Sequence, residues 1–235
     1  MRKSYFTAIH LLQKGMGIRK MKYGLMPQAM WLCFRKSFAR ELYRMSKDDP
    51  MEVMAKAQKR YRKIIVPIPE FEKGDPFLVN ILSAAMLAAV YLELSEEPHL
   101  DQVTDFYHHA MTNNIVMKCY LKRTNHYTKR AQSKLAQQAK ESARRVKGNP
   151  YTWRFRFEAG PDINSYSAIF TSCGIMKLLL SLDISDICPA MCTYDYDMAK
   201  LGGSEFTRQH TLAGEDLCCD CHWRKQPKES AHYKG

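Results

Sequence analysis

The chain has 235 residues, of which 46% are apolar and 26% charged, and it carries a net charge of +12. This composition is typical of a globular protein and excludes the fibrous and largely disordered classes. The length allows one α+β domain with an extension, and no apolar run reaches the roughly 18 to 20 residues that a membrane-spanning helix needs.

The cysteines and the N-terminus indicate a compartment. The first residues include Arg2, Lys3 and Lys14 and show no small-residue cleavage site, so we expect no secretory signal and a cytoplasmic protein. Six of the eight cysteines lie in the last third of the chain, from Cys173 onward. In a cytoplasmic chain such a cluster predicts free thiols, a metal site or catalysis rather than disulfides.

The positive charge is concentrated in two blocks. Residues 1–63 hold 16 Lys and Arg against 4 Asp and Glu, and residues 118–156 hold 12 against 1. Such blocks can neutralise phosphates when their charges share one face. Because no zinc-finger, helix-turn-helix or RNA-binding aromatic signature accompanies them, we favour solvated helix faces. We expect a small-molecule substrate as partner and no membrane; the two blocks leave a nucleic acid open as the less favoured partner.

Helical periodicity dominates the first two thirds of the sequence. Apolar residues recur every three or four positions over 26–45, and a second helix follows over 50–63, so 1–66 is predicted to be a basic helical N-terminal extension. Asp75 and Pro76 have the form of an N-cap and first turn and predict a buried helix over 77–94. Two further helices are predicted, over 98–113 and 128–147.

The pattern changes to alternation at Trp153. The sequence predicts strands over 153–157, 166–172, 205–210 and 217–223, and helices over 174–182 and 186–200. The predicted fold class is therefore α+β, with a small antiparallel sheet from the C-terminal half covered by helices and a helical N-terminal extension. We assign the α+β domain to residues 67–225 and a polar tail to 226–235.

One stretch of this domain, residues 153–224, resembles the L-2-amino-thiazoline-4-carboxylic acid hydrolase family. That family shows a strand ending in Cys, a Pro-x-x-Cys-x-x-Asp helix, a glycine-ended turn, Arg-x-x-Thr-Leu-Ala-x-Gly and a final Cys-Asp strand. The matching residues here are Cys173, Pro189, Cys192, Asp195, Gly202, Gly203, Arg208, Thr211, Leu212, Ala213, Gly214, Cys219 and Asp220. After Cys-Asp the chain has Cys221, His222 and Trp223, where the family has an aromatic residue and Arg. The resemblance implies a hydrolase that adds water across the amidine-like carbon–nitrogen bond of a thiazoline ring.

Hydrolysis at such a carbon needs a nucleophile or activated water and a proton shuttle. Cys192 and Asp195 are three residues apart, so they lie on one face of their helix, with Cys188 one turn earlier. A thiol beside a carboxylate needs a cation or a helix N-terminus for activation. Arg208 or His210 could supply that cation to Cys192.

Cys173 is the second predicted nucleophile, because it begins a helix whose dipole favours a thiolate. We rank Cys173 and Cys192 nearly equal as nucleophiles. The alternative for each is a small buried apolar residue, the commoner fate of an intracellular cysteine. Asp195 is predicted to be the general base or the ion-pair partner of Arg208.

The residues predicted to bind substrate follow Asp195 in the chain: Arg208, Thr211, Gly214, Cys219 and Asp220. Arg208 suits a bidentate clamp on a carboxylate. Thr211 to Gly214 can form a turn that offers N–H groups to an oxyanion, although we favour a plain hairpin connection. Cys219 and Asp220 point to opposite faces of the last strand, so one of them should face the core.

Two alternatives remain beside the hydrolase. A zinc site could use thiolates and imidazole, although the spacings match no common zinc module, so we expect neither a metal nor another cofactor. The residues of that alternative are Cys188, Cys192, Cys219, Cys221 and His222. The other alternative is a non-catalytic small-ligand-binding or sensor domain on the same fold.

Overall fold

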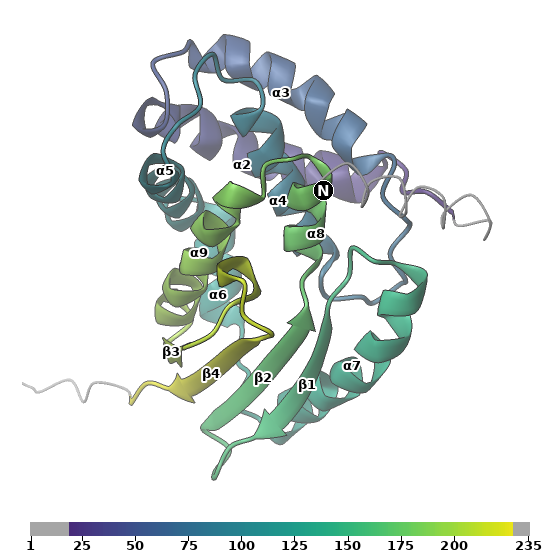
Figure 1. Ribbon diagram of the computed structural model, residues 1–235. Coiled ribbons are helices and arrows are strands. Elements are labelled where there is room, and N and C mark those ends of the chain that lie inside the picture. Colours follow the sequence, from purple (N-terminus) through teal and green to yellow (C-terminus); the bar gives the residue numbers. More distant parts are fainter. Residues whose placement is uncertain (1–18, 228–235) are drawn as a thin grey trace, which may run out of the picture.

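The computed structural model describes residues 19–227 (Figure 1). These residues form an α+β fold in which a four-stranded antiparallel sheet from the C-terminal half is covered by helices, as the sequence predicts. The α-helices are α2 (Leu25–Glu41), α3 (Pro50–Ile65), α4 (Leu78–Tyr91), α5 (Leu100–Thr112), α6 (Ile115–Arg123), α7 (Lys129–Gly148), α8 (Gly174–Ser181) and α9 (Cys188–Leu201). Three 3-10 turns accompany them: η1 (Leu42–Arg44), η2 (Ser185–Ile187) and η3 (Leu212–Gly214).

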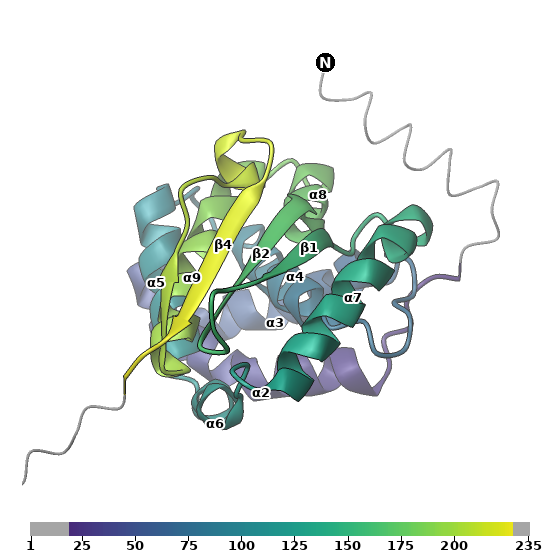
Figure 2. The same cartoon turned by 90° about the horizontal axis from the view of Figure 1, so that it is seen from below.

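The sheet has the order β1-β2-β4-β3. Its strands are β1 (Arg154–Ala159), β2 (Ser165–Ser172), β3 (Ser204–Thr207) and β4 (Cys219–Lys225). Figure 2 shows the helices on one side of this sheet, with the other side open. Side chains alternate accordingly, since Phe155, Ala168 and Cys221 are buried while Arg156 and His222 are exposed. Helix α7 packs against β1, and α9 against β3.

Helix α4 forms the centre of the core. Every residue from Ile81 to Tyr91 is buried, as expected for a helix that is apolar on all sides. Within residues 19–227, no helix is both long and apolar enough to cross a membrane.

Helices α2 and α3 share this core. Phe38, Leu42 and Tyr61 are buried in one cluster with Phe106 of α5 and Leu178 of α8. The predicted boundary after residue 66 therefore does not coincide with a break in the core. Helices α2 and α3 pack against α4, and α8, which follows strand β2, packs against α4 as well.

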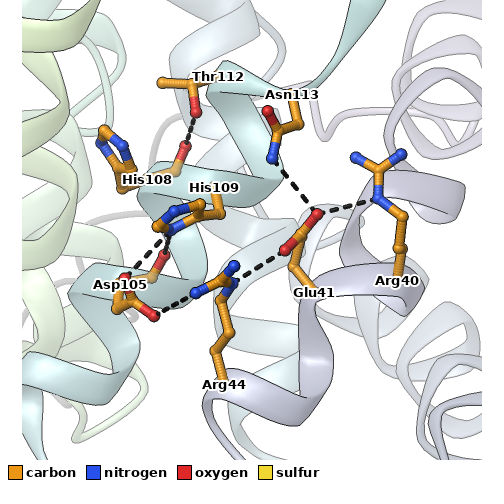
Figure 3. Close-up of polar contacts among 8 residues, drawn as sticks. All are labelled: Arg40, Glu41, Arg44, Asp105, His108, His109, Thr112 and Asn113. Carbon is orange, nitrogen blue, oxygen red and sulfur yellow. Dashed lines mark hydrogen bonds and ion pairs between the residues drawn. The ribbon is translucent and has the colours of Figure 1, made fainter.

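A buried carboxylate also joins α2 to α5 (Figure 3). Glu41, with only 6% of its side chain exposed, accepts from Nε of Arg40 and Nε of Arg44, both at 2.9 Å. Arg44 also donates to Asp105 at 3.0 Å, and Asn113 donates to Glu41 at 3.4 Å. Two guanidinium groups thus compensate the charge that Glu41 carries into the interior.

Several predicted boundaries are corrected. Asp75 is not the N-cap of α4; Phe77 is, and Asp75 accepts from Phe77 N (2.9 Å) and Thr152 Oγ1 (2.7 Å). The predicted strand over 205–210 ends at Thr207, because Arg208 turns inward. Helix α6 was not predicted at all; six of its nine residues, 118–123, were interpreted only as part of the second basic block.

Candidate functional site

Helix α9 carries two of the three predicted catalytic residues, Cys192 and Asp195, on one face. It begins at Cys188 with Pro189 in its first turn, where proline costs no hydrogen bond. Cys192 and Asp195 follow on the side that meets the segment 208–218 and β4. Both side chains are partly accessible, so the face is closed only in part.

Asp195 and Arg208 form an ion pair beneath that segment. Arg208 Nη1 donates to Asp195 Oδ2 at 2.9 Å, and Nη2 donates to the carbonyl oxygen of Cys192 at 3.0 Å. The Arg208 side chain is 8% exposed and lies over the rings of Tyr196 and Phe206. Of the two cations proposed for Cys192, the structure places Arg208 there, whereas His210 faces Asp216 at 3.6 Å.

The pKa of Asp195 is raised to about 6, because burial outweighs the attraction of Arg208. One third of the side chain remains exposed (33%), so protons can exchange with solvent. A carboxyl with this pKa can both give and take a proton near neutral pH.

The segment 208–218 is folded over α9 by hydrogen bonds to side chains. Asp220 Oδ1 accepts from Gln209 N at 3.1 Å and His210 N at 2.5 Å, and Asp216 Oδ2 accepts from Thr211 N at 2.8 Å. Asp220 therefore organises the backbone on the outer side of this segment. The same backbone hydrogen bonds hold its pKa below the usual range, although burial opposes them.

Thr211 lies at the inner side of this segment. Its Oγ1 is 3.9 Å from Cys192 Sγ and 3.6 Å from Cys219 Sγ, and Cys219 Sγ accepts from Leu212 N at 3.2 Å. Gly214 closes the turn by donating to Thr211 O at 2.9 Å. The N–H groups of Leu212, Ala213 and Gly214 are thus engaged within the turn, and none points to an open oxyanion position.

The two predicted nucleophiles differ in their pKa. The neighbouring Cys188 thiol, one helix turn away, together with Arg208 and Thr211 lowers the pKa of Cys192 despite burial and Asp195. The pKa of Cys188 is raised instead, because Cys188 is 1% exposed and Arg208 and Thr211 face Cys192.

The surroundings of Cys173 oppose the thiolate that its helix position favours. Cys173 is the N-cap of α8, and its sulfur accepts from Met176 N at 3.5 Å. Burial nevertheless raises its pKa to about 12, because one weak hydrogen bond does not offset desolvation. The backbone of the next residue is also closely packed, since a Cβ on Gly174 would lie 2.0 Å from Tyr151 O.

Some neighbouring residues were not predicted as catalytic or substrate-binding residues. Cys221, considered only as a zinc ligand, lies two residues after Cys219 on the same strand face and is buried within the electrostatic reach of Asp195 and Arg208. Lys177 is half-buried near Cys173 and donates to Ser172 Oγ at 2.7 Å. Tyr194 has a buried hydroxyl without a hydrogen-bond partner in the described part of the chain. Their positions in the sequence could have indicated them. Cys221 follows Cys219 by two residues on a strand, and Lys177 follows Cys173 by four residues on a helix, so each shares a face with a predicted residue.

In residues 19–227, no group of three or more His, Cys, Asp and Glu side chains has an arrangement that could hold a metal ion. His222 of the zinc alternative lies on the opposite sheet face from Cys219 and Cys221, where Nδ1 is 2.7 Å from Ser167 Oγ.

Most predicted site residues therefore meet at one place, between the start of α8, one face of α9 and the segment that precedes β4. Among residues 19–227, Gly214 and Asp220 form no side-chain hydrogen bonds with the other predicted residues. They stabilise the backbone of the segment 208–218 instead. We call the group formed by Cys173, Cys188, Cys192, Asp195, Arg208, Thr211 and Cys219 the thiol cluster.

One family model matches the chain. It describes L-2-amino-thiazoline-4-carboxylic acid hydrolase and covers residues 79–223, more than half of the sequence and all of the thiol cluster. No curated protein and no solved structure matches.

Proposed function

Because the chain belongs to the L-2-amino-thiazoline-4-carboxylic acid hydrolase family, we propose that it hydrolyses a non-peptide carbon–nitrogen bond in a small carboxylated heterocycle or amidine. The observation that carries the proposal is the position of Cys192. Its thiol lies 3.9 Å from the Thr211 hydroxyl, one helix turn after Cys188 and beside the Arg208–Asp195 pair. A nucleophile next to a group that transfers protons is the arrangement that covalent hydrolysis needs.

In the first step, the Cys192 thiolate adds to the carbon of the protonated amidine, whose ring nitrogen already carries one hydrogen. Asp195 in its acid form gives a proton to the ring nitrogen, the carbon–nitrogen bond breaks, and the nitrogen leaves as an amine. The carbon remains bound to the Cys192 sulfur. The Arg208 guanidinium holds Asp195 in place beside this carbon throughout.

In the second step, water attacks the same carbon. The Asp195 carboxylate takes a proton from this water, and the carbon–sulfur bond to Cys192 breaks to restore the thiolate. One water is consumed in total and the cysteine is regenerated. The pKa of about 6 lets Asp195 act in both directions near neutral pH.

The substrate carboxylate requires a cation. Arg208 has both terminal nitrogens occupied, by Asp195 and by the carbonyl of Cys192. Lys177, half-buried at the edge of the thiol cluster with a hydroxyl as its hydrogen-bond partner, is better placed for this role.

The pH dependence of turnover tests the role of Asp195. We predict that the water step, which needs the ionised carboxylate, limits turnover, so kcat for 2-amino-thiazoline-4-carboxylate should rise as pH increases through about 6. In Asp195→Asn this inflection should disappear and the residual rate should be low. Circular dichroism over the same pH range controls for unfolding. An unchanged inflection in Asp195→Asn would assign the titration to another group and remove Asp195 from the mechanism.

A further inference from the structure

Helices α2 and α6 lie next to each other at the lower edge of Figure 2, where the N-terminal end of α6 meets α2. Asn114, the N-cap of α6, donates to Cys33 O at 2.9 Å and to Ser37 Oγ at 3.2 Å, both on α2. Asn114 is buried, so its side-chain amide needs these two partners on α2. The two hydrogen bonds therefore hold the start of α6 against α2.

Both helices expose large apolar side chains. Ile115 is 74% exposed and Tyr120 61% on α6, and Leu32 is 57% exposed on α2. A shallow hollow of about 570 Å³ runs along α6 and is lined by Ile115, Val116, Cys119, Tyr120, Arg123 and Thr124. Apolar groups gathered on one surface mark an interaction site more often than single exposed residues do.

The charge around these groups has one sign. Neither residues 1–40 nor residues 106–140 contain Asp or Glu. Helix α2 exposes Arg35 and Lys36, and α6 exposes Lys122 and Arg123. Within residues 19–227 these four cations lie in no ion pair. The surface is therefore complementary to an anionic partner.

We propose that the surface formed by α2 and α6 docks on an anionic lipid membrane. Aliphatic side chains flanked by unpaired Lys and Arg are the features of a helix that lies in the plane of the lipid headgroups. Hydrocarbon takes up Ile115, Val116 and Leu32, while the cations near the surface are attracted to anionic lipid headgroups. A single-stranded nucleic acid would instead favour a row of aromatic rings between the cations.

This inference differs from the sequence expectation that a membrane is not a partner. That expectation considered only an apolar run long enough to span a bilayer. Attachment to the surface needs a much smaller apolar area, provided that electrostatic attraction adds to it.

Co-sedimentation of the full chain with vesicles tests the proposal. We expect binding to vesicles of phosphatidylcholine with about 30% phosphatidylserine, little binding to phosphatidylcholine alone, and weakening as salt rises. Lys122→Glu/Arg123→Glu should lower the partition coefficient at least about tenfold. Ile115→Ser/Val116→Ser should lower it several-fold, roughly as the lost apolar area predicts.

The matched control is Lys59→Glu/Lys63→Glu, two exposed lysines on α3, which lies far from α6 in Figure 1. It makes the same change in net charge and should retain most of the binding. Equal losses in the control would reduce the effect to net charge and overturn the proposal. So would equal binding to both vesicles, or capture of a single-stranded RNA oligonucleotide without capture of anionic vesicles.

Discussion

Cys192→Ser is expected to lower kcat/KM for 2-amino-thiazoline-4-carboxylate by about 10³-fold or more. A serine hydroxyl keeps its proton under conditions in which Cys188, Arg208 and Thr211 favour the thiolate of Cys192. The loss is therefore chemical and leaves packing almost intact. Steady-state turnover measured beside a thermal melt should show a large fall in rate and a nearly unchanged melting temperature.

Two further substitutions make this result specific. Cys33→Ser, at an exposed position of α2, should keep wild-type activity. Cys173→Ser should lose no more than about tenfold, because burial keeps the Cys173 thiol protonated. If Cys173→Ser were inactive and Cys192→Ser active, the assignment of the nucleophile would be reversed.

Arg208→Ala is expected to reduce the free energy of unfolding by about 2 to 3 kcal/mol. Removal of one partner from a buried ion pair costs more than this, and partial exposure of Asp195 reduces the penalty. The variant also loses the contacts of the guanidinium with Tyr196 and Phe206. Urea denaturation at neutral pH measures the change.

The control for this prediction is Arg156→Ala. Arg156 also pairs with a carboxylate, Glu158 at 2.7 Å, but on the exposed face of β1. A surface pair of this kind contributes about 0 to 1 kcal/mol, so the control should unfold almost as the wild type does. The double variant Arg208→Met/Asp195→Leu should recover much of the loss, because no unpaired charge stays in the interior. Equal destabilisation by Arg208→Ala and Arg156→Ala would mean that the Asp195–Arg208 pair is not structurally important.

Local patterns predicted the elements that carry the site. The three-residue spacing of Cys192 and Asp195 defines a helix face whatever surrounds it, and the structure has both side chains on that face. The alternation from Trp153 likewise fixed which strand residues face the helices. Helix α6 was not predicted, because its apolar residues are few and are interrupted by lysine and arginine, so no clear helical periodicity is visible.

The arrangement of the segment 208–218 could not be predicted, because its shape depends on contacts between distant residues. Asp220 was predicted to bind substrate, yet its carboxylate accepts hydrogen bonds from the N–H groups of Gln209 and His210. Cys173 was predicted to be an activated thiol because it begins a helix, yet burial raises the pKa of this thiol. In both cases tertiary burial and pairing outweigh the local signal.

The central claim is that Cys192 is the reactive thiol of this chain. Alkylation by a limiting dose of iodoacetamide at neutral pH, mapped by mass spectrometry with and without 2-amino-thiazoline-4-carboxylate, tests it most directly. We predict that Cys192 reacts faster than Cys173, Cys188, Cys219 and Cys221, and that the ligand protects it. Similar labelling of all these thiols, with no protection by the ligand, would contradict the account.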